Sequence, residues 1–327
     1  MKKQRCISLR LCSLAVRQNR PLSFLKLLLV STYKTSFKFV SLALFILLAF
    51  ANCKTATKTQ AVPAQQNALL WQITGKGLTK PSYLYGTIHM ICPEDFSMSD
   101  TLKASFAKSE KIYLEIDMDD PAMTMKTLQL AIMKDKSLSD LMSKEDYARL
   151  DKFMKDSIGM PLMIFNKMKP FTLMSVLYTK VLPCKKMESY EQSFMTMAQQ
   201  QKKELLGLEK LEDQFAVFDK IPDSAEAQMI LHMINDFDGQ RKEFAKMTEA
   251  YKKKDLDALS KMISASPDIA GFEDLLLVNR NMNWIPVMEK AMIAQGNFFA
   301  VGAGHLPGND GVITLLKKAG YTVVPVD

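Results

Sequence analysis

Strand-like runs stand at both ends of the part of this 327-residue chain that is patterned as a folded domain, and they enclose a long helical middle. The first two runs are joined by a short polar segment that contains glycine, so they predict a β-hairpin. One sheet assembled from both ends of the chain, with the helices packed on it, explains this order most simply. The five runs are ALLWQIT (68–74), SYLYGTIHM (82–90), KIYLEID (111–117), NFFAVGA (297–303) and YTVVPV (321–326).

We therefore expect an α+β fold, in which a central mixed β-sheet built from the N- and C-terminal strands packs with a large helical section. The stretch from 121 to about 290 is rich in Met, Lys, Leu and Glu and is interrupted by prolines, which favours several helices. One long helix is predicted over 223–254, and a short one near 100–109. Near the C-terminus, Asn309 is a suitable N-cap and Gly320 a suitable stop for another helix.

The net charge of +8 belongs to the first 53 residues. This leader carries nine Lys and Arg and no Asp or Glu, so the remainder of the chain has a charge of about −1. A nearly neutral body lacks the basic surface that nucleic-acid binding requires, so we expect no nucleic-acid partner. The 48% hydrophobic content is ample for a packed core.

The leader, residues 1–53, has the pattern of an export signal. Basic residues precede an uncharged apolar run, 39–51, which is short for a membrane span and suits a secretory signal. The following Asn52-Cys53 resembles the end of a loose bacterial lipobox, with Cys53 as the lipidated residue. We expect an exported, membrane-anchored lipoprotein of the cell envelope; cleaved soluble export and an uncleaved anchor are the alternatives. Residues 54–67 are expected to form a flexible tether, and 68–327 one domain.

Cys92 and Cys184 are the two cysteines of the body. In an oxidising compartment they would form a disulfide, and otherwise they are two ordinary buried thiols. Their sequence spacing does not decide between these alternatives, because the distance between them in space does.

Two of the three histidines follow the same Gly-x-x-His phrase, more than two hundred residues apart. Gly86 precedes His89, and Gly302 precedes His305; each glycine stands at a strand end, where it permits a tight turn or close backbone approach. We expect both imidazoles side by side beyond the ends of neighbouring strands, where chemistry is usual in such folds. His232, within a helical pattern, is more simply a structural histidine.

An acidic residue ends the third strand-like run. Glu115 follows Ile112, Tyr113 and Leu114, and a carboxylate buried among them needs a partner. We expect its strand to neighbour the hairpin strand that precedes His89, which makes Glu115 a metal ligand, a general base or a structural ion-pair partner. Asp117 is a second-choice ligand on the same face.

Two histidines and a carboxylate form a familiar ligand set for a divalent metal with an open position. Such a metal lowers the pKa of bound water and polarises a carbonyl, which is hydrolytic chemistry. The donor set does not distinguish Mn²⁺, Co²⁺ and Zn²⁺. HExxH, paired CxxC, Walker and G-x-S-x-G phrases are absent from the sequence, so the corresponding enzyme classes lack support.

The order of these phrases resembles the TraB/GumN family, which is related to the TIKI metalloproteases. The resemblance runs over 68–327, and Phe171 stands where the family usually has Trp after Lys-Pro, a difference that we expect to affect packing more than catalysis. The anchors are the two Gly-x-x-His phrases, Glu115, a Gly-Leu-Glu with a following Gln (Gly207, Leu208, Glu209, Gln214) and an Asn-Arg-Asn segment (Asn279, Arg280, Asn281).

The resemblance implies a divalent-metal-dependent, metalloprotease-like hydrolase that acts on a peptide or protein. His89, His305 and Glu115 would be catalytic and would bind the metal. Arg280 would hold Glu209 or Glu115 in a bidentate pair or bind a substrate carboxylate. Residues expected around these groups are Gly86, Gly302, Glu209, Gln214 and Asn281. Two alternatives remain: an envelope protein that sequesters a peptide, metal or haem-like ligand without turnover, and an accessory protein with structural histidines.

Overall fold

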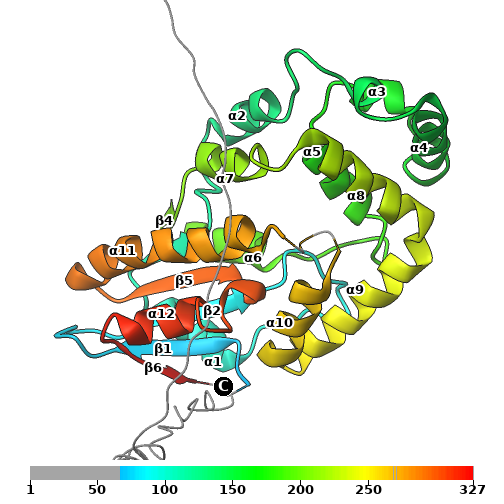
Figure 1. The fold of residues 1–327 in the computed structure, drawn as a ribbon. Coiled ribbons are helices and arrows are strands. Elements are labelled where there is room, and N and C mark those ends of the chain that lie inside the picture. Colours follow the sequence, from blue (N-terminus) through cyan, green and yellow to red (C-terminus); the bar gives the residue numbers. More distant parts are fainter. Residues whose placement is uncertain (1–66, 268, 270, 327) are drawn as a thin grey trace, which may run out of the picture. The chain divides into compact units, whose positions relative to one another are not determined.

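Six strands form one mixed sheet in the order β4-β3-β5-β2-β1-β6 (Figure 1). The structure is a computed structural model and describes residues 67–267, 269 and 271–326. The leader, most of the tether and the expected lipidation site at Cys53 lie outside the described residues. The strands are β1 (Leu70–Thr74), β2 (Ser82–Thr87), β3 (Lys111–Leu114), β4 (Glu204–Gly207), β5 (Asn297–Gly302) and β6 (Thr322–Pro325).

The strand pairing confirms a sheet built from both ends of the domain. β1 runs antiparallel to β2 and to β6, as the predicted hairpin requires. β2, β5, β3 and β4 are parallel to one another, with Thr87 opposite Gly302 in the β2–β5 register. Because parallel strands end at the same edge of a sheet, the residues that follow these four strands meet there.

Helices supply the rest of the domain and confirm the mixed α/β class. In Figure 1, α11 and α12 lie beside the strands of the sheet. Three shorter turns are η1 (Leu162–Phe165), η2 (Asp274–Val278) and η3 (Ala303–His305). The helices are α1 (Asp100–Lys108), α2 (Met123–Leu130), α3 (Leu138–Leu141), α4 (Lys144–Ser157), α5 (Pro170–Tyr178), α6 (Tyr190–Gln200), α7 (Leu211–Phe218), α8 (Asp223–Asn235), α9 (Phe237–Lys252), α10 (Leu256–Ala265), α11 (Asn279–Ala294) and α12 (Val312–Lys318).

Four details of the sequence-based expectation are wrong. The middle of the chain contributes a strand, β4, which pairs with β3. The helix expected over 223–254 is two helices, because Asp236 leaves helical geometry (φ −128°, ψ 53°) and its side chain caps α9 by accepting from the N–H of Gly239. The last helix begins after Gly311 rather than Asn309. The strand that precedes Glu115 pairs with β5, not with β2.

The buried apolar side chains form two clusters. The larger surrounds the sheet and includes Trp71, Trp284 and Phe298. The smaller lies among α3, α4, α5 and α8 and includes Leu150 and Leu173. Burying these side chains is the main stabilising contribution of each cluster, at about 25 cal/mol per Å² of apolar surface. The helical cluster therefore gives the domain a second packed body beside the sheet.

A disulfide joins Cys92 to Cys184, with the Cα atoms 5.8 Å apart, which decides between the two alternatives left open by the sequence. Next to it, Ile91 and Glu188 exchange backbone hydrogen bonds of 3.1 and 2.9 Å. The loop after β2 is thereby fixed to the segment that enters α6. Among the helices of residues 67–326, none is both long and apolar enough to span a bilayer.

Candidate functional site

Four polar side chains follow the four parallel strands and meet at one edge of the sheet. His89 comes two residues after β2, Glu115 directly after β3, Glu209 two residues after β4, and His305 at the end of η3 beyond β5. Glu115 and His305 are buried, with exposed fractions of 9% and 5%, whereas the His89 side chain is 64% exposed. His89 is thus the member of this group that faces solvent.

Gly302 is the point around which three of these side chains converge. Its N–H donates to Oε1 of Glu115 at 2.8 Å. A Cβ placed on Gly302 would lie 3.4 Å from Oε1 of Glu115, 3.5 Å from Nε2 of His89 and 3.6 Å from Cδ2 of His305. The missing side chain therefore leaves a small space that a carboxylate oxygen and two imidazole rings surround.

Arg280, on α11, joins the two buried carboxylates. Its Nη2 lies 2.5 Å from Oε2 of Glu115 and 2.6 Å from Oε1 of Glu209, and its Nε also donates to Glu209 at 3.0 Å. Burial works against the charge of Arg280, but the two carboxylates outweigh it and raise the pKa of Arg280. Burial would raise the pKa of Glu115, but the guanidinium and the neighbouring groups hold it well below its ordinary value. The pair is therefore charged at neutral pH.

Further side chains fix these carboxylates. Gln214, on α7, donates to Glu209 at 3.2 Å and to Glu115 at 3.4 Å. The indole of Trp284 donates to Oε2 of Glu209 at 3.1 Å, and its ring lies 4.8 Å from the guanidinium carbon of Arg280. Glu209 is thus the residue that holds Arg280 in place, as a bidentate carboxylate does.

His305 is neutral and has a defined tautomer. The amide nitrogen of Asn281 donates to the carbonyls of Asp310 and His305, so its Oδ1 is left to accept from Nδ1–H of His305 at 2.6 Å. Nε2 of His305 then carries the lone pair, which faces Nη1 of Arg280 at 3.3 Å and Oε1 of Glu115 at 3.9 Å. Burial, with Arg280 alongside, lowers the pKa of His305 to about 3.

His89 has a carboxylate partner that sequence reasoning missed. Its Nδ1 lies 2.9 Å from Oε1 of Glu191, which also accepts from Thr87 at 2.6 Å, while Oε2 accepts from Ser189 at 2.8 Å. The atoms packed around the imidazole reduce its hydration and so disfavour its charged form. The hydrogen bond to Glu191 outweighs this effect and raises the pKa of His89. A signal existed: Ser189 is the N-cap of α6 and Glu191 lies in its first turn, within the SYEQSF phrase.

The two phrase glycines have different roles. Neither Gly86 nor Gly302 has a positive φ, so neither is needed for a left-handed turn. A Cβ on Gly86 would lie 2.7 Å from Cδ1 of Leu306 and 3.1 Å from Cα of Ala303. Gly86 therefore allows η3 to approach β2 closely, whereas Gly302 keeps the space beside Glu115 open. Of the two roles expected for a glycine here, close approach is the one observed.

A cavity of about 410 Å³ opens onto the site. Its polar lining includes His89, Glu115 and Arg280, together with Ser175, Ser189, Glu191 and Gln214. The rest of its wall is apolar and comes from Leu114, Ile116, Met118, Phe171 and Phe218. The expectation that Phe171 matters mainly for packing is therefore incomplete, because its ring also borders this cavity.

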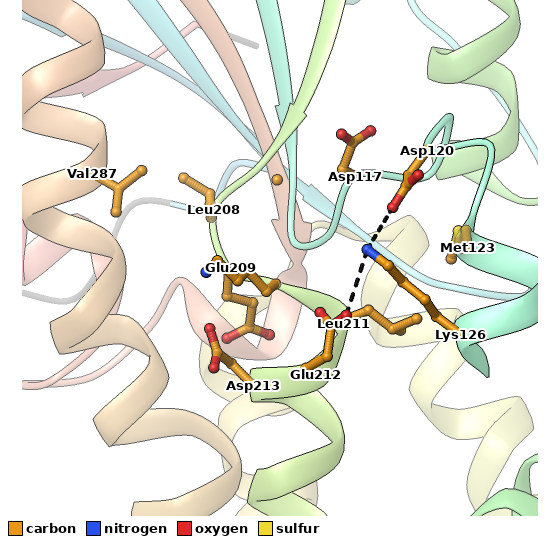
Figure 2. Close-up of a pocket in the computed structure, with 12 residues that line it drawn as sticks. Asp117, Asp120, Met123, Lys126, Leu208, Glu209, Leu211, Glu212, Asp213 and Val287 are labelled. Atoms are coloured by element: carbon orange, nitrogen blue, oxygen red, sulfur yellow. Dashed lines mark hydrogen bonds and ion pairs between the residues drawn. The ribbon is translucent and has the colours of Figure 1, made fainter. Parts of the chain in front are cut away.

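Asp117 borders a different cavity, of about 830 Å³ (Figure 2), and neither His89 nor His305 is among the residues that line it. There Lys126 pairs with Asp120 at 2.9 Å and with Glu212 at 3.5 Å. Burial and the neighbouring Asp119 raise the pKa of Asp117 to about 6. Glu209 borders this second cavity, so the Arg280 network separates Asp117 from the site that holds Glu115.

The other residues expected around the site lie near these side chains, apart from Cys53, which is outside the described residues. Arg280 binds both Glu115 and Glu209, where the expectation named one or the other, and Asn281 contacts His305 directly. Within the residues that the structure describes, no three His, Cys, Asp or Glu side chains stand as a ready metal-binding group.

The chain is therefore an α/β protein. Polar side chains that follow four parallel strands, together with a buried arginine, form a candidate site at the edge of its sheet. The model of the TraB/PrgY/gumN family matches residues 69–325, so the chain belongs to this family. No curated protein and no solved structure matches the chain.

Proposed function

We propose that this family member is a divalent-metal-dependent, metalloprotease-like hydrolase that cleaves peptide or related amide or ester bonds. One observation carries the proposal: Oε1 of Glu115, Nε2 of His89 and the ring of His305 surround the open space over Gly302. This brings together two imidazoles and a carboxylate, the ligand types of hydrolytic metal sites.

The hydrogen bonds made by both histidines support the proposal that they bind a metal. Metal-binding imidazoles are usually oriented by a hydrogen bond at the other ring nitrogen. Glu191 contacts Nδ1 of His89, and Asn281 contacts Nδ1 of His305, which leaves both Nε2 atoms for a ligand. The donor set therefore fits a divalent metal held by His89, His305 and Glu115, with Mn²⁺, Co²⁺ and Zn²⁺ all compatible.

Arg280 competes with a metal for the same partners. It already binds Oε2 of Glu115 and faces Nε2 of His305. Glu209 and Trp284 hold Arg280 from the other side, so it has an anchor that does not depend on Glu115. When bound, the metal would polarise the scissile carbonyl and lower the pKa of a water molecule.

The side chains of the chain itself have separate tasks in this proposal. Glu191 accepts a hydrogen bond from Nδ1–H of His89, which orients the ring and leaves Nε2 to bind the metal once its proton is released. Arg280 offers a fixed positive charge beside the reacting centre, where negative charge develops during acyl transfer. Asn281 keeps His305 in one tautomer.

The cell envelope is the proposed location. The basic and apolar leader supports export, and Cys53 supports a lipid anchor in the membrane. The disulfide adds independent support, because disulfides persist in oxidising compartments outside the cytosol. We propose a peptide or protein of that compartment as substrate.

The second candidate is a binding protein that holds a peptide, metal or haem-like ligand without turnover. The Arg280–Glu115 contact of 2.5 Å favours this second candidate, because the guanidinium already compensates the charge of the buried carboxylate. Metal content and turnover separate the two functions.

The test measures bound metal in the purified full chain by elemental mass spectrometry and cleavage of a quenched-fluorescent peptide library. His89→Ala and His305→Ala are expected to lose metal and turnover, whereas His232→Ala, the remaining histidine, keeps both. Wild-type protein that takes up none of Mn²⁺, Co²⁺ and Zn²⁺ would refute the metal site. Metal uptake without cleavage of any peptide would support the binding protein instead.

A further inference from the structure

The cavity beside Glu115 has one polar and one apolar side. Ile116, Met118, Phe171 and Phe218 form the apolar side, which we call the apolar wall, and each is only partly buried. The polar side carries Glu115, His89 and Arg280. A ligand in this cavity would therefore touch the reactive groups and the apolar wall at the same time.

The two aromatic rings of the wall support each other. The rings of Phe171 and Phe218 lie in contact and nearly parallel, with planes 16° apart. Phe171 stands at the start of α5, directly after Pro170, and its N–H donates to Oε2 of Glu226 at 3.2 Å. Stacked aromatic rings held at a helix start form a rigid surface, which lowers the entropic cost of binding.

The charges around the cavity disfavour an ionic ligand group. Arg280 is 7% exposed and is engaged by Glu115 and Glu209. Glu191 is engaged by His89 and Thr87. An anionic side chain would meet two carboxylates and two cationic groups, Arg280 and His89, that are already paired with them, and no lysine borders the cavity among the described residues.

We infer that the substrate presents an uncharged aliphatic or aromatic side chain to this wall, next to the bond that Glu115 and His89 face. Phe171 and Phe218 are then specificity-determining residues. This inference rests on the proposed function only where it calls the ligand a substrate. The predicted binding preference does not depend on turnover. The apolar side chain would gain the free energy of leaving water while the neighbouring amide stays at the polar side.

The test uses four peptides, N-acetyl-Ala-X-Ala-amide with X as Leu, Phe, Gly or Glu, and the full chain. Ligand-observed NMR measures binding, and the same spectra report cleavage, so the two are read separately. The Leu and Phe peptides are expected to bind about tenfold more tightly than the Gly and Glu peptides. Phe218→Ala and Phe171→Ala should each remove most of this preference.

Phe153→Ala is the matched control. Phe153 belongs to the same helical cluster, is also partly buried, and packs edge-to-face on Phe237 with centroids 4.9 Å apart, but it does not line the cavity. The Phe153→Ala protein should be less stable but should still prefer the Leu and Phe peptides. Phe171→Trp, which keeps an aromatic wall, should also keep this preference.

Equal affinity for the Leu and Gly peptides, tighter binding of the Glu peptide, or no binding of any peptide would overturn the inference. Loss of the preference in Phe153→Ala to the same extent would overturn it as well. A clear preference without cleavage would support the apolar wall while contradicting the proposed hydrolase. Cleavage that ignores the identity of X would leave the hydrolase standing and refute the wall.

Discussion

Nη2 of Arg280 lies 2.5 Å from Oε2 of Glu115, and both side chains are buried at the edge of the sheet where four parallel strands end. The same nitrogen lies 2.6 Å from Glu209. One guanidinium thus compensates two buried carboxylates that come from different strands. This contact links the charge balance at the edge of the sheet to the candidate site.

Removing Arg280 should destabilise the domain strongly. Arg280→Ala leaves Glu115 and Glu209 buried without a countercharge, and breaking a buried pair in this way costs about 3–5 kcal/mol. Glu115→Gln removes one charge but keeps hydrogen-bonding capacity, so its loss should be smaller. Urea denaturation followed by circular dichroism measures both.

Glu289→Gln is the control for the arginine prediction. Glu289 pairs with Lys76 at the surface, where such a pair contributes about 0–1 kcal/mol. If Arg280→Ala costs no more than this control, the buried network does not stabilise the fold as we describe.

Alanine substitutions at Gly302 and Gly86 should have different effects on stability and turnover. The Cβ of Gly302→Ala meets only ordinary contacts of 3.4–3.6 Å, so the free energy of unfolding should change by less than about 1 kcal/mol. The same methyl occupies the space between Glu115 and His89 in which the proposed metal would bind, so turnover should fall by about 100-fold. Thermal unfolding and cleavage of the peptide library measure the two effects.

Gly86→Ala provides the contrast to Gly302→Ala. Its Cβ would lie 2.7 Å from Leu306 and 3.1 Å from the backbone of Ala303, and such overpacking costs about 1–3 kcal/mol. A Gly302→Ala protein with full turnover would show that the space over Gly302 is not part of the reaction site.

The disulfide should stabilise the domain and the position of His89. Cys92 and Cys184 are 92 residues apart in sequence, so the bond closes a long loop in the unfolded chain, and removing it should cost about 2–4 kcal/mol. The expected result is a lower melting temperature for Cys92→Ser/Cys184→Ser, matched by wild-type protein in dithiothreitol. A double variant that melts with the oxidised wild type would contradict this prediction.

Glu226 should make stability depend on pH. Burial, with Asp223 and Asp219 nearby, raises its pKa to about 7, above the ordinary value of 4.5. The folded state therefore favours the protonated carboxyl, so its contribution is fully present below pH about 4.5 and is lost as the pH rises through about 7. The loss amounts to at most about 3 kcal/mol.

Glu226→Gln isolates this dependence, because the amide stays neutral and can still accept from the N–H of Phe171. The difference in unfolding free energy between wild type and Glu226→Gln should grow in favour of the variant from pH 5 to pH 8. Parallel curves across that range would show that Glu226 does not titrate in the folded protein as proposed.

Much of the fold followed from local patterns. The hairpin, the strands at both ends and the neighbouring positions of the two strands that precede the Gly-x-x-His phrases were all confirmed, because short apolar runs bounded by turn residues carry strong local signals. Strand β4 was missed because its four residues, Glu204–Gly207, begin only a few residues after α6 and are too few to show a period. The break at Asp236 was missed because no proline or glycine occupies it.

The site divides in the same way. The residue types and their order were enough to predict His89, His305, Glu115 and Arg280. They did not predict Glu191, because the disulfide and the Ile91–Glu188 bridge bring α6 to the loop after β2. Asp117 shared a predicted face with Glu115, yet β3 ends at Leu114 and the chain then turns toward another cavity.

The sequence alone determined the residue types of the site and the strand ends on which they stand, since both are local properties of the chain. Tertiary structure decided which of them touch: that Arg280 holds two carboxylates, that Cys92 meets Cys184, and that Phe171 borders the cavity. These contacts join residues up to 165 apart in sequence, as between Arg280 and Glu115. They depend on the packing of the whole domain, which no local pattern specifies.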